Sequence, residues 1–345
     1  MKNKFLFIKK IDHVFDMTTD VGFWQFAKGV SPDTSYGYSI DDQARALILV
    51  LFLYQRKKER KFLNLAKIYL NFIKKAQRND GYFHNFADAK GKFIDNIGSQ
   101  DSFGRATWAL GVCHNHGTKT LIEKSLKIFK KAKIRIKNLR YIRSKAYAML
   151  GLLHFYKNSE DSEIEIILHS FASYMIKKYR KTSTGNWRFF ENKLIYANAI
   201  LPYSLLCYSE AFSSEETAEI GLESFNFLDK TCRSKGLPAP IGNKGWYEKG
   251  SKKIFFDPQP IDVCDMILAA GKAYDLTGDK KYFKIASEWF AWFFGRNIHN
   301  SVFYDLETGG CHDGIRSHKL NPDEGAESTI CFHLANLEIE RLYKK

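Results

Sequence analysis

Apolar residues recur along the chain at helical spacing, and this pattern predicts twelve helices. In the third predicted helix, for example, Phe62, Leu65, Tyr69 and Phe72 fall on one face. The predicted helices cover residues of about 9–18, 39–57, 60–77, 101–116, 119–135, 141–157, 161–180, 194–212, 214–232, 259–276, 280–296 and 324–343. The chain is therefore expected to be all-α.

The predicted helices alternate in character. The odd-numbered ones are amphipathic and carry lysines, as in 119–135. The even-numbered ones are apolar nearly all round and contain small residues, as in 101–116, 141–157 and 259–276. A helix that is apolar on every side is buried, so the even helices form an inner set and the odd helices an outer one.

The links between the helices also alternate. Links after even helices are a few residues long, and links before them are mostly long, the fifth-to-sixth link being the exception. The long loops therefore gather where the inner helices begin. This organisation predicts an (α/α)6 barrel as a single domain over residues 1–345. An open α-solenoid is the alternative, but solenoid repeats keep a regular period and short loops, so the unequal loops favour closure.

Composition excludes several classes of protein. Hydrophobic residues make up 45% of the chain, enough for a sizeable core, yet no apolar run approaches the roughly 18–20 residues of a membrane span. The apolar segment at residues 5–8 is too short for a signal peptide. The six cysteines show neither disulfide nor metal spacing, which favours a reducing, cytoplasmic location.

The chain is basic, with 53 Lys and Arg against 38 Asp and Glu and a net charge of +15. A basic chain can bind nucleic acid, and the segment 119–145 is the richest in Lys and Arg. These lysines lie along an amphipathic helix, where they form a solvated face, and no nucleic-acid-binding motif accompanies them. We therefore expect no nucleic-acid partner.

Polar residues cluster where the even helices begin, and the second helix is the clearest case. Its start carries Ser39 as an N-cap, followed by the acids Asp41 and Asp42. Neighbours on a helix point about 100° apart, so one acid faces the loop end of the barrel while the other caps the helix or pairs with Arg45. We favour Asp42 as the acid that faces the loop end.

Acids, amides and aromatic rings together suit carbohydrate chemistry. Cleavage of an acetal uses two carboxylates, one as proton donor and one as base or nucleophile. The catalytic candidates are Asp42, Asp101, Glu191, Glu327 and Asp41. The candidates for binding a sugar are Tyr38, His84, Arg105, Trp187, Asn198, Gln259, His312 and Asp313. Each of these residues also has a structural alternative as a helix cap, an ion-pair partner or a core residue.

Other chemistries lack their motifs. The chain contains no dinucleotide-binding glycine motif, no P-loop, no zinc-protease motif and no nucleophile elbow. The segment His114-Asn-His116 resembles a metal motif, but it ends a helix, where histidines interact with the helix dipole. We therefore expect no cofactor and no metal.

Several motifs carry a resemblance to a known family. They are Gly37-Tyr-Ser-Ile-Asp-Asp-Gln-Ala-Arg-Ala-Leu47, Gly98-Ser-Gln-Asp-Ser-Phe-Gly-Arg105, Trp108-Ala-Leu-Gly111, Trp187-Arg-Phe-Phe-Glu191, Asn198-Ala199, Gln259-Pro260, Tyr304-Asp-Leu-Glu-Thr-Gly-Gly-Cys-His-Asp-Gly314 and Gly325-Ala-Glu-Ser-Thr329. They resemble a poorly characterised bacterial family in the six-hairpin glycosidase-like superfamily. The resemblance implies an (α/α)6 barrel and activity on carbohydrates. Members of the family occur beside or fused to glycosyltransferases, which implies a glycosyltransferase as a possible partner.

The chain departs from the family pattern at three positions. Gln43 stands where the family usually has Asn, Gln100 where it has Glu, and Ala197 where it has Asp. The loss of two acids weakens the case for catalysis. Three hypotheses remain: a glycoside hydrolase acting on an oligosaccharide, a sugar epimerase or lyase with His84 or His312 as base, and a non-catalytic glycan-binding or glycosyltransferase-partner module.

Overall fold

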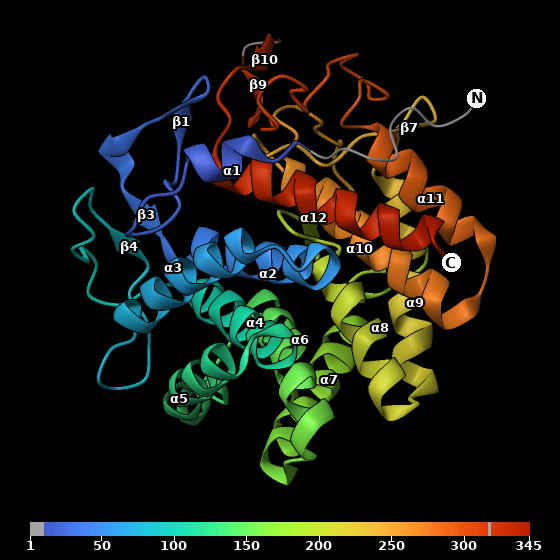
Figure 1. Cartoon of the computed structure of the whole chain (residues 1–345). Helices are drawn as coiled ribbons and strands as arrows, with labels where there is room; N and C mark the ends of the chain where they lie inside the picture. The colour runs from blue at the N-terminus through green and yellow to red at the C-terminus, as the bar shows by residue number, and fades with distance from the viewer. Residues whose placement is uncertain (1–9, 317–318) are drawn as a thin grey trace. The chain divides into compact units, whose positions relative to one another are not determined.

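The computed structural model describes residues 10–316 and 319–345, and in this part of the chain helices predominate (Figure 1). The helices are α1 (Asp12–Asp16), α2 (Ile40–Lys57), α3 (Arg60–Ala76), α4 (Gln100–His116), α5 (Lys119–Ile136), α6 (Ile142–Ser159), α7 (Ser162–Thr182), α8 (Ile200–Phe212), α9 (Glu215–Thr231), α10 (Pro260–Thr277), α11 (Lys280–Ala291) and α12 (Ala326–Tyr343). All twelve predicted helices are confirmed. Residue 9, at the start of the first prediction, lies outside the described residues.

Three predicted helices are at least five residues longer than the observed ones. Helix α1 is confined to Asp12–Asp16. Helix α8 begins later than residue 194, because residues 193–194 form a strand and Ala197 has a left-handed backbone with φ of 47°. Helix α11 ends at Ala291 because the following turn is closed by hydrogen bonds between residues three apart, which do not continue an α-helix.

The strands are short antiparallel pairs within the long loops. They are β1 (Ala27–Lys28) with β2 (Ser31–Pro32), β3 (Tyr38–Ser39) with β4 (Phe86–Ala87), β5 (Lys193–Leu194) with β8 (Tyr247–Glu248), β6 (Arg233–Ser234) with β7 (Leu237–Pro238), and β9 (Gly314–Arg316) with β10 (Lys319–Asn321). The β3–β4 pair ties the loop before α2 to the loop before α4, so it helps to fix where both helices start.

The predicted alternation of link lengths is confirmed. Two residues separate α2 from α3, α4 from α5, α6 from α7, α8 from α9 and α10 from α11. Four of these links begin with a left-handed residue that ends the preceding helix: Lys58, Glu160, Ser213 and Gly278. A left-handed cap stops a helix within one residue and lets its partner return along it.

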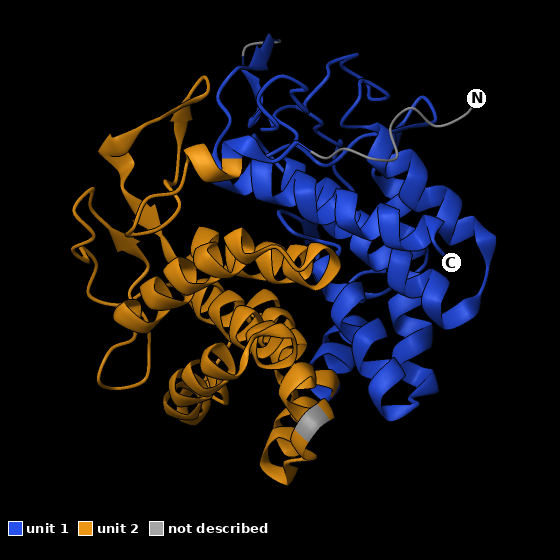
Figure 2. Cartoon of the chain, viewed as in Figure 1, with its two compact units in different colours: residues 1–13, 173–345 blue, residues 14–172 orange. Residues whose placement is uncertain are grey.

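The chain divides into two compact units (Figure 2). Residues 14–172 form one unit, in which α2 packs on α4, α4 packs on α6, and α3 and α5 pack on α2 and α4. Residues 173–345, with the described residues that precede 14, form the other. Here α8 packs on α10, α10 packs on α12, and α9 and α11 pack on α8 and α10. The predicted single domain over 1–345 stays a prediction.

The difference between inner and outer helices is confirmed within each unit. Every residue of α4 from Ser102 to Cys113 is buried, as is every residue of α12 from Ser328 to Leu337. In α3, by contrast, buried residues such as Phe62, Leu65 and Tyr69 recur at helical spacing on one face. The even helices thus form the core of each unit, and their starts carry the polar residues.

Glycines allow α4 and α6 to touch through their backbones. A Cβ atom on Gly151 would lie 2.3 Å from the carbonyl oxygen of Thr107, and one on Gly111 would lie 2.3 Å from that of Gly151. A Cβ on Gly104 would lie 2.6 Å from the carbonyl oxygen of Ser144. These contacts exclude any larger residue and place the first turn of α6 against that of α4.

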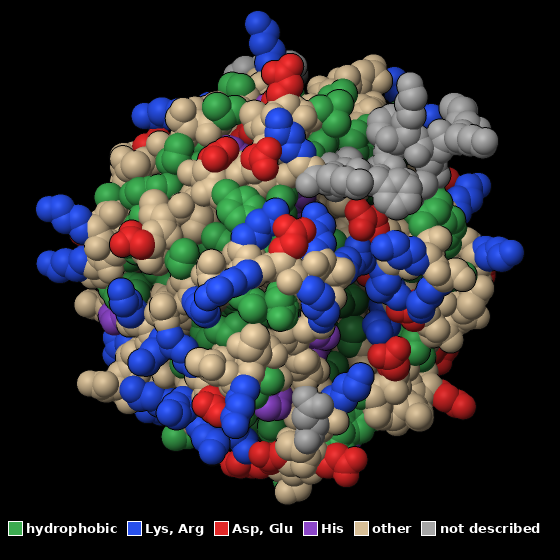
Figure 3. Space-filling model, viewed as in Figure 1, with side chains coloured by type: hydrophobic (Ala, Val, Ile, Leu, Met, Phe, Trp, Pro, Cys, Tyr) green, Lys and Arg blue, Asp and Glu red, His purple; other side chains and the backbone are tan. Residues whose placement is uncertain are grey.

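Two features of the chain bear on its surroundings. All six cysteines are free thiols in the structure. None of the described helices is long and apolar enough to cross a membrane. On the face shown in Figure 3, lysine and arginine side chains are spread among acidic and uncharged ones.

Candidate functional site

The unit of residues 14–172 holds one cluster of candidate residues, at the start of α2. Ser39 caps the helix: its Oγ accepts a hydrogen bond from the Asp42 backbone N–H at 3.2 Å and donates one to Asp42 Oδ2 at 2.6 Å. Asp42 Oδ1 accepts a further bond from Arg45 at 3.0 Å, and Asp42 is only 4% exposed. These contacts place Asp42 in a structural role, contrary to our preference for it as the acid that faces outward.

Asp41 lies in the same helical turn in a different environment. Its side chain is 24% exposed, and its Oδ1 lies 3.5 Å from the Nε of Arg105, a residue of α4. Arg105 is itself held by Tyr147 of α6, because its guanidinium stacks over the ring at 4.3 Å and donates to the hydroxyl at 2.9 Å. Asp41 is therefore a partly accessible carboxylate beside an immobilised cation, which favours it over Asp42 for chemistry.

Asp101 opens α4 in the same unit. Its Oδ1 accepts a hydrogen bond from Ser144 Oγ of α6 at 2.5 Å, a contact made possible by the close approach of α6 at Gly104. The preceding residue, Gln100, accepts bonds from the backbone N–H groups of Arg140 and Tyr141. Gln100 thus anchors the two residues that lead into α6.

Two further sugar-binding candidates of this unit have mainly structural contacts. Tyr38 is 1% exposed, stacks on Trp24 at 4.2 Å and bonds to Thr19 through its hydroxyl. We propose no sugar contact for Tyr38. His84 is half-buried, and its Nδ1 lies 2.7 Å from the carbonyl oxygen of Asp95. A carbonyl only accepts, so Nδ1 carries the proton and Nε2 is left as the basic nitrogen.

The contacts of Gln43 give a structural reason for glutamine at a position where the family that the sequence resembles usually has asparagine. Its side chain is fully buried, accepts a hydrogen bond from the Phe23 N–H and donates to the carbonyl oxygens of Phe23 and Ser39. A Cβ on Gly22 would collide with this amide at 2.6 Å. Gln43 therefore holds the loop before α2 in place, and its longer side chain reaches further than asparagine would.

The other unit contains the candidates from the loop before α8. Trp187 is 5% exposed and packs against Phe227 and Tyr247, and its Nε1 donates to the carbonyl oxygen of Glu191. Asn198 is also buried, and its amide exchanges two hydrogen bonds with the backbone of residue 195. Both positions favour structural roles. Glu191 is half-buried and stays a candidate.

Gln259 lies at the start of α10, beside Asp257. Its Nε2 donates to the Asp257 carbonyl oxygen at 3.3 Å, and Asp257 Oδ1 accepts from the Ile315 N–H at 3.2 Å. Gly314 fits between them, because a Cβ there would lie 2.5 Å from Asp257 Oδ1. Burial raises the pKa of the Asp257 carboxyl above its usual value.

Asp313 and Glu327 come together at the start of α12. Asp313 Oδ1 accepts a hydrogen bond from the Gly325 N–H at 3.0 Å, and Ser328 bonds to the same side chain. Burial raises the pKa of the Asp313 carboxyl to about 7, and the negative charge of Glu327 contributes to the rise. The structure thus brings a predicted catalytic acid and a predicted sugar-binding acid into one cluster.

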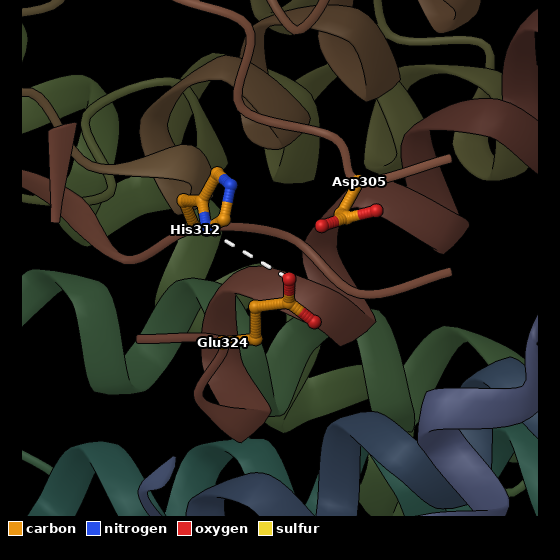
Figure 4. Close-up of side chains that lie close together, drawn as sticks. All are labelled: Asp305, His312 and Glu324. Atoms are coloured by element: carbon orange, nitrogen blue, oxygen red, sulfur yellow. Dashed lines mark ion pairs between the residues drawn. The ribbon is translucent and has the colours of Figure 1, made fainter. Parts of the chain in front are cut away.

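Next to this cluster, His312 faces two acids that the sequence did not pair with it (Figure 4). Its Nδ1 lies 3.8 Å from Oε1 of Glu324, and Asp305 completes a group whose ligand-type atoms all lie within 4.8 Å of one another. His13, from α1, bonds to the backbone oxygen of Glu324 at 2.8 Å. Burial raises the pKa of the Glu324 carboxyl.

Sequence reasoning missed three residues of these clusters. Ser144 and Tyr147 lie on one face of α6, three residues apart, beside the arginines at its start, and this spacing is the signal that could have identified them. His13 is far from Glu324 in sequence and had no such signal.

Comparisons with known proteins support the fold. No protein-family model and no curated protein matches the sequence. Among solved structures, a sugar epimerase from a ruminal bacterium matches with a TM-score of 0.75 and 14% identity over 95% of this chain and 94% of its own. A cellobiose 2-epimerase from Bacillus thermoamylovorans matches with a TM-score of 0.75 and 11% identity, over 97% and 96%. A GH76 α-mannanase from Bacteroides thetaiotaomicron matches with a TM-score of 0.64 and 12% identity, over 96% and 93%.

The chain shares the fold of these structures over nearly its whole length. The predicted all-α (α/α)6 barrel is thereby confirmed as the fold class. The structures that share it include both epimerases and hydrolases, and at this level of identity the fold does not choose between the two reactions.

Proposed function

We propose that this protein is a carbohydrate-active enzyme, and specifically a glycoside hydrolase that cleaves an oligosaccharide. The proposal is supported by the sugar epimerases and the mannanase among the similar structures and by the acids that begin the inner helices. The observation that carries the proposal is the environment of Asp41. This carboxylate is partly exposed in the first turn of α2 and lies beside Arg105.

The surroundings of Asp41 differ from those of a structural carboxylate. The capping bond of α2 runs from the Asp42 N–H to Ser39 Oγ, whereas Asp41 Oδ1 lies 3.5 Å from Arg105 Nε. Arg105 lies on a different helix and is held in position by Tyr147. An arginine fixed in this way orients the carboxylate and compensates its charge.

Asp101 is the proposed second carboxylate. It opens the adjacent inner helix of the same unit, and Ser144 fixes the orientation of its carboxyl group. In hydrolysis, a proton passes from one acid to the leaving oxygen, the bond between that oxygen and the sugar's anomeric carbon breaks, and the oxygen of water ends on that carbon. We assign Asp101 as proton donor and Asp41 as the carboxylate that acts at the anomeric carbon or on the attacking water.

The test is a screen of oligosaccharides in D2O followed by NMR. A hydrolase generates new reducing ends, and the anomer formed first reports retention or inversion. Asp41→Asn and Asp101→Asn are expected to lower kcat by about 100-fold or more, with turnover expressed per folded protein as measured by circular dichroism. Glu123→Gln removes an exposed acid of α5 and serves as the control, with unchanged turnover.

Full turnover in both aspartate variants would refute the assignment. Glu191→Gln and Glu327→Gln then identify whether the acids of the other unit carry the reaction. Binding of an oligosaccharide by calorimetry with no turnover of any substrate would instead support the non-catalytic module, with a glycosyltransferase as its proposed partner.

A sugar epimerase is the second candidate function. It is favoured by the higher TM-scores of the two epimerases, 0.75 against 0.64 for the mannanase, and by His84, whose Nε2 is left as a base. An epimerase exchanges a substrate C–H for C–D in D2O without forming new reducing ends. Loss of that exchange in His84→Gln, with Asp41→Asn still active, would select this function.

We also propose that the protein works in the cytoplasm. Its six thiols are all unpaired, and five of them are buried. Export of a reporter-tagged full-length chain to the periplasm or medium would contradict this location.

A further inference from the structure

The loop between α11 and α12 folds back on itself and presents two potential metal ligands. Tyr304 pairs with Cys311 in an antiparallel bridge, so Asp305 and His312 lie at the base of a tight hairpin. The hairpin is closed by a hydrogen bond from the Asp305 N–H to the Gly310 carbonyl oxygen at 3.0 Å. Both side chains are therefore held by backbone geometry before any ligand arrives.

Glu324 supplies the third side chain from the residue pair that precedes α12. Its side chain has no exposed surface, and its Oε2 accepts a hydrogen bond from Thr308 at 2.8 Å. Its Oε1 and the Nδ1 of His312 are both buried and have no hydrogen-bond partner in the part of the chain that the structure describes. Figure 4 shows these two groups facing each other, with the Asp305 carboxylate beside them.

The unpartnered atoms point to a missing positive charge. A buried carboxylate oxygen without a partner costs several kcal/mol, and such groups are normally paired or coordinate metals. Among residues 10–316 and 319–345, the side chains within ion-pair distance of Glu324 are His13 and His312. His13 already bonds to the Glu324 backbone oxygen, and the 3.8 Å between His312 and Glu324 is too long for a hydrogen bond.

We propose that Asp305, His312 and Glu324 form a binding site for a divalent transition metal, with zinc as the first choice. One nitrogen and two carboxylate oxygens suit zinc, whereas calcium and magnesium prefer oxygen alone. Ligands about 2.0–2.1 Å from zinc lie about 3.3 Å apart, so His312 and Glu324 need to close by about 0.5 Å. Water or a substrate atom would fill the fourth position of this site.

The site would join three distant pieces of one unit. Asp305 and His312 belong to the hairpin, Glu324 leads into α12, and the backbone of Glu324 is bonded by His13 of α1. Metal binding would therefore fix the hairpin and the start of α12 together. This inference concerns the metal alone and does not depend on the proposed carbohydrate chemistry. It also revises the expectation from sequence that no metal is bound.

The experiment uses the full chain, purified on a tag that is removed and never exposed to a metal column. We expect about one zinc per chain by mass spectrometry of the metal content and binding of zinc by calorimetry after chelation. Zinc at about 100 times its dissociation constant is expected to raise Tm by about 5 °C. Glu324→Gln and His312→Gln should abolish both the bound zinc and the Tm shift.

His169→Gln is the matched control, because His169 pairs with Glu165 at 3.4 Å in an exposed histidine–glutamate pair of α7. It should bind zinc as the unaltered chain does. If Glu324→Gln does not fold, the more exposed Asp305→Asn replaces it. Zinc that binds equally to all variants, or a Tm that neither zinc nor chelator changes, would overturn the proposal. The three side chains would then be a shared-proton cluster or an ion pair.

Discussion

The inner helices of the two units begin with similar residues but hold their acids in opposite ways. In the unit of residues 14–172, Asp42 bonds to Arg45 and Asp41 lies beside Arg105, so arginines compensate the acids. At the starts of α10 and α12 in the other unit, Asp257 and Asp313 are held by backbone N–H groups, and burial raises their pKa values. Arginines thus compensate the two acids that begin α2, whereas burial favours the protonated forms of Asp257 and Asp313.

The comparison shows that the position of an acid at the start of an apolar helix does not by itself determine how its charge is compensated. The helix dipole is common to all these positions, but the nearby arginine is not. Arg45 lies three residues after Asp42 in its own helix, whereas α12 has no arginine in the two turns after Glu327. Arg105, which compensates Asp41, belongs to a different helix, so sequence spacing identifies the Asp42 pair but not the Asp41 pair.

The largest expected effect comes from breaking an arginine-held acid. Asp42→Asn should lower the free energy of unfolding by about 3 kcal/mol, because it leaves Arg45 as a buried charge without its partner. Urea titration at neutral pH measures this loss. The double variant Asp42→Asn with Arg45→Met should recover part of the stability, since neither charge then remains buried. A single variant as stable as the unaltered chain would show that the arginine pair contributes nothing.

The fold was predictable from sequence because its signals are local and repeated. Helical periodicity, apolar inner helices and two-residue links recur five or six times, so an error at one element changes little. The helix ends that differ, at α8 and α11, depend on a strand pairing and a tight turn that no periodicity reports.

The candidate site was predictable only in part. The acids at the helix starts could be found, but the choice between Asp41 and Asp42 depends on which side chain meets Arg105, a contact between helices. The cluster of Asp305, His312 and Glu324 has no motif spacing, since a hairpin brings it together. Tyr38 and Trp187 are predicted to stack on a sugar because they are aromatic. Their burial, which the sequence does not report, favours a role in the core instead.

A smaller effect is expected in the unit that contains residues 173–345, where the stability contribution of Asp257 should depend on pH. Because burial raises the folded-state pKa of Asp257, its contribution to stability is complete below about pH 3.8 and is lost as pH rises through the folded-state pKa. Asp257→Asn keeps an acceptor for Ile315 and does not titrate, so it should gain stability relative to the unaltered chain as pH rises to 7. The gain should be a fraction of the roughly 1.4 kcal/mol that one pKa unit represents, because the group is half-buried.

Asp33, in the unit of residues 14–172, has a pKa shifted in the opposite direction from that of Asp257. Its hydrogen bond from the Ser35 hydroxyl holds its pKa below the usual value, so its contribution is present above about pH 3.8 and is lost as pH falls. Asp33→Asn should therefore lose stability relative to the unaltered chain at neutral pH, and the two should converge in acid. Unfolding curves for both variants between pH 3 and 7 measure the two slopes. Slopes of the same sign would contradict the opposite pKa shifts of Asp257 and Asp33.

The smallest effect concerns the departures from the family pattern, which also differ between the units. Gln43 makes three hydrogen bonds in its buried site, whereas Ala197 is held in a left-handed conformation with φ of 47°. A left-handed conformation costs a residue with a Cβ about 1–2 kcal/mol, and glycine avoids that cost but loses more chain entropy. Ala197→Gly should therefore raise the free energy of unfolding by about 0.5–1 kcal/mol. Ala199→Gly, at a right-handed position two residues later, should instead lower it by about 0.5–1 kcal/mol. Equal losses in both variants, measured by urea titration, would show that Ala197 is unstrained and that the departure has no energetic consequence.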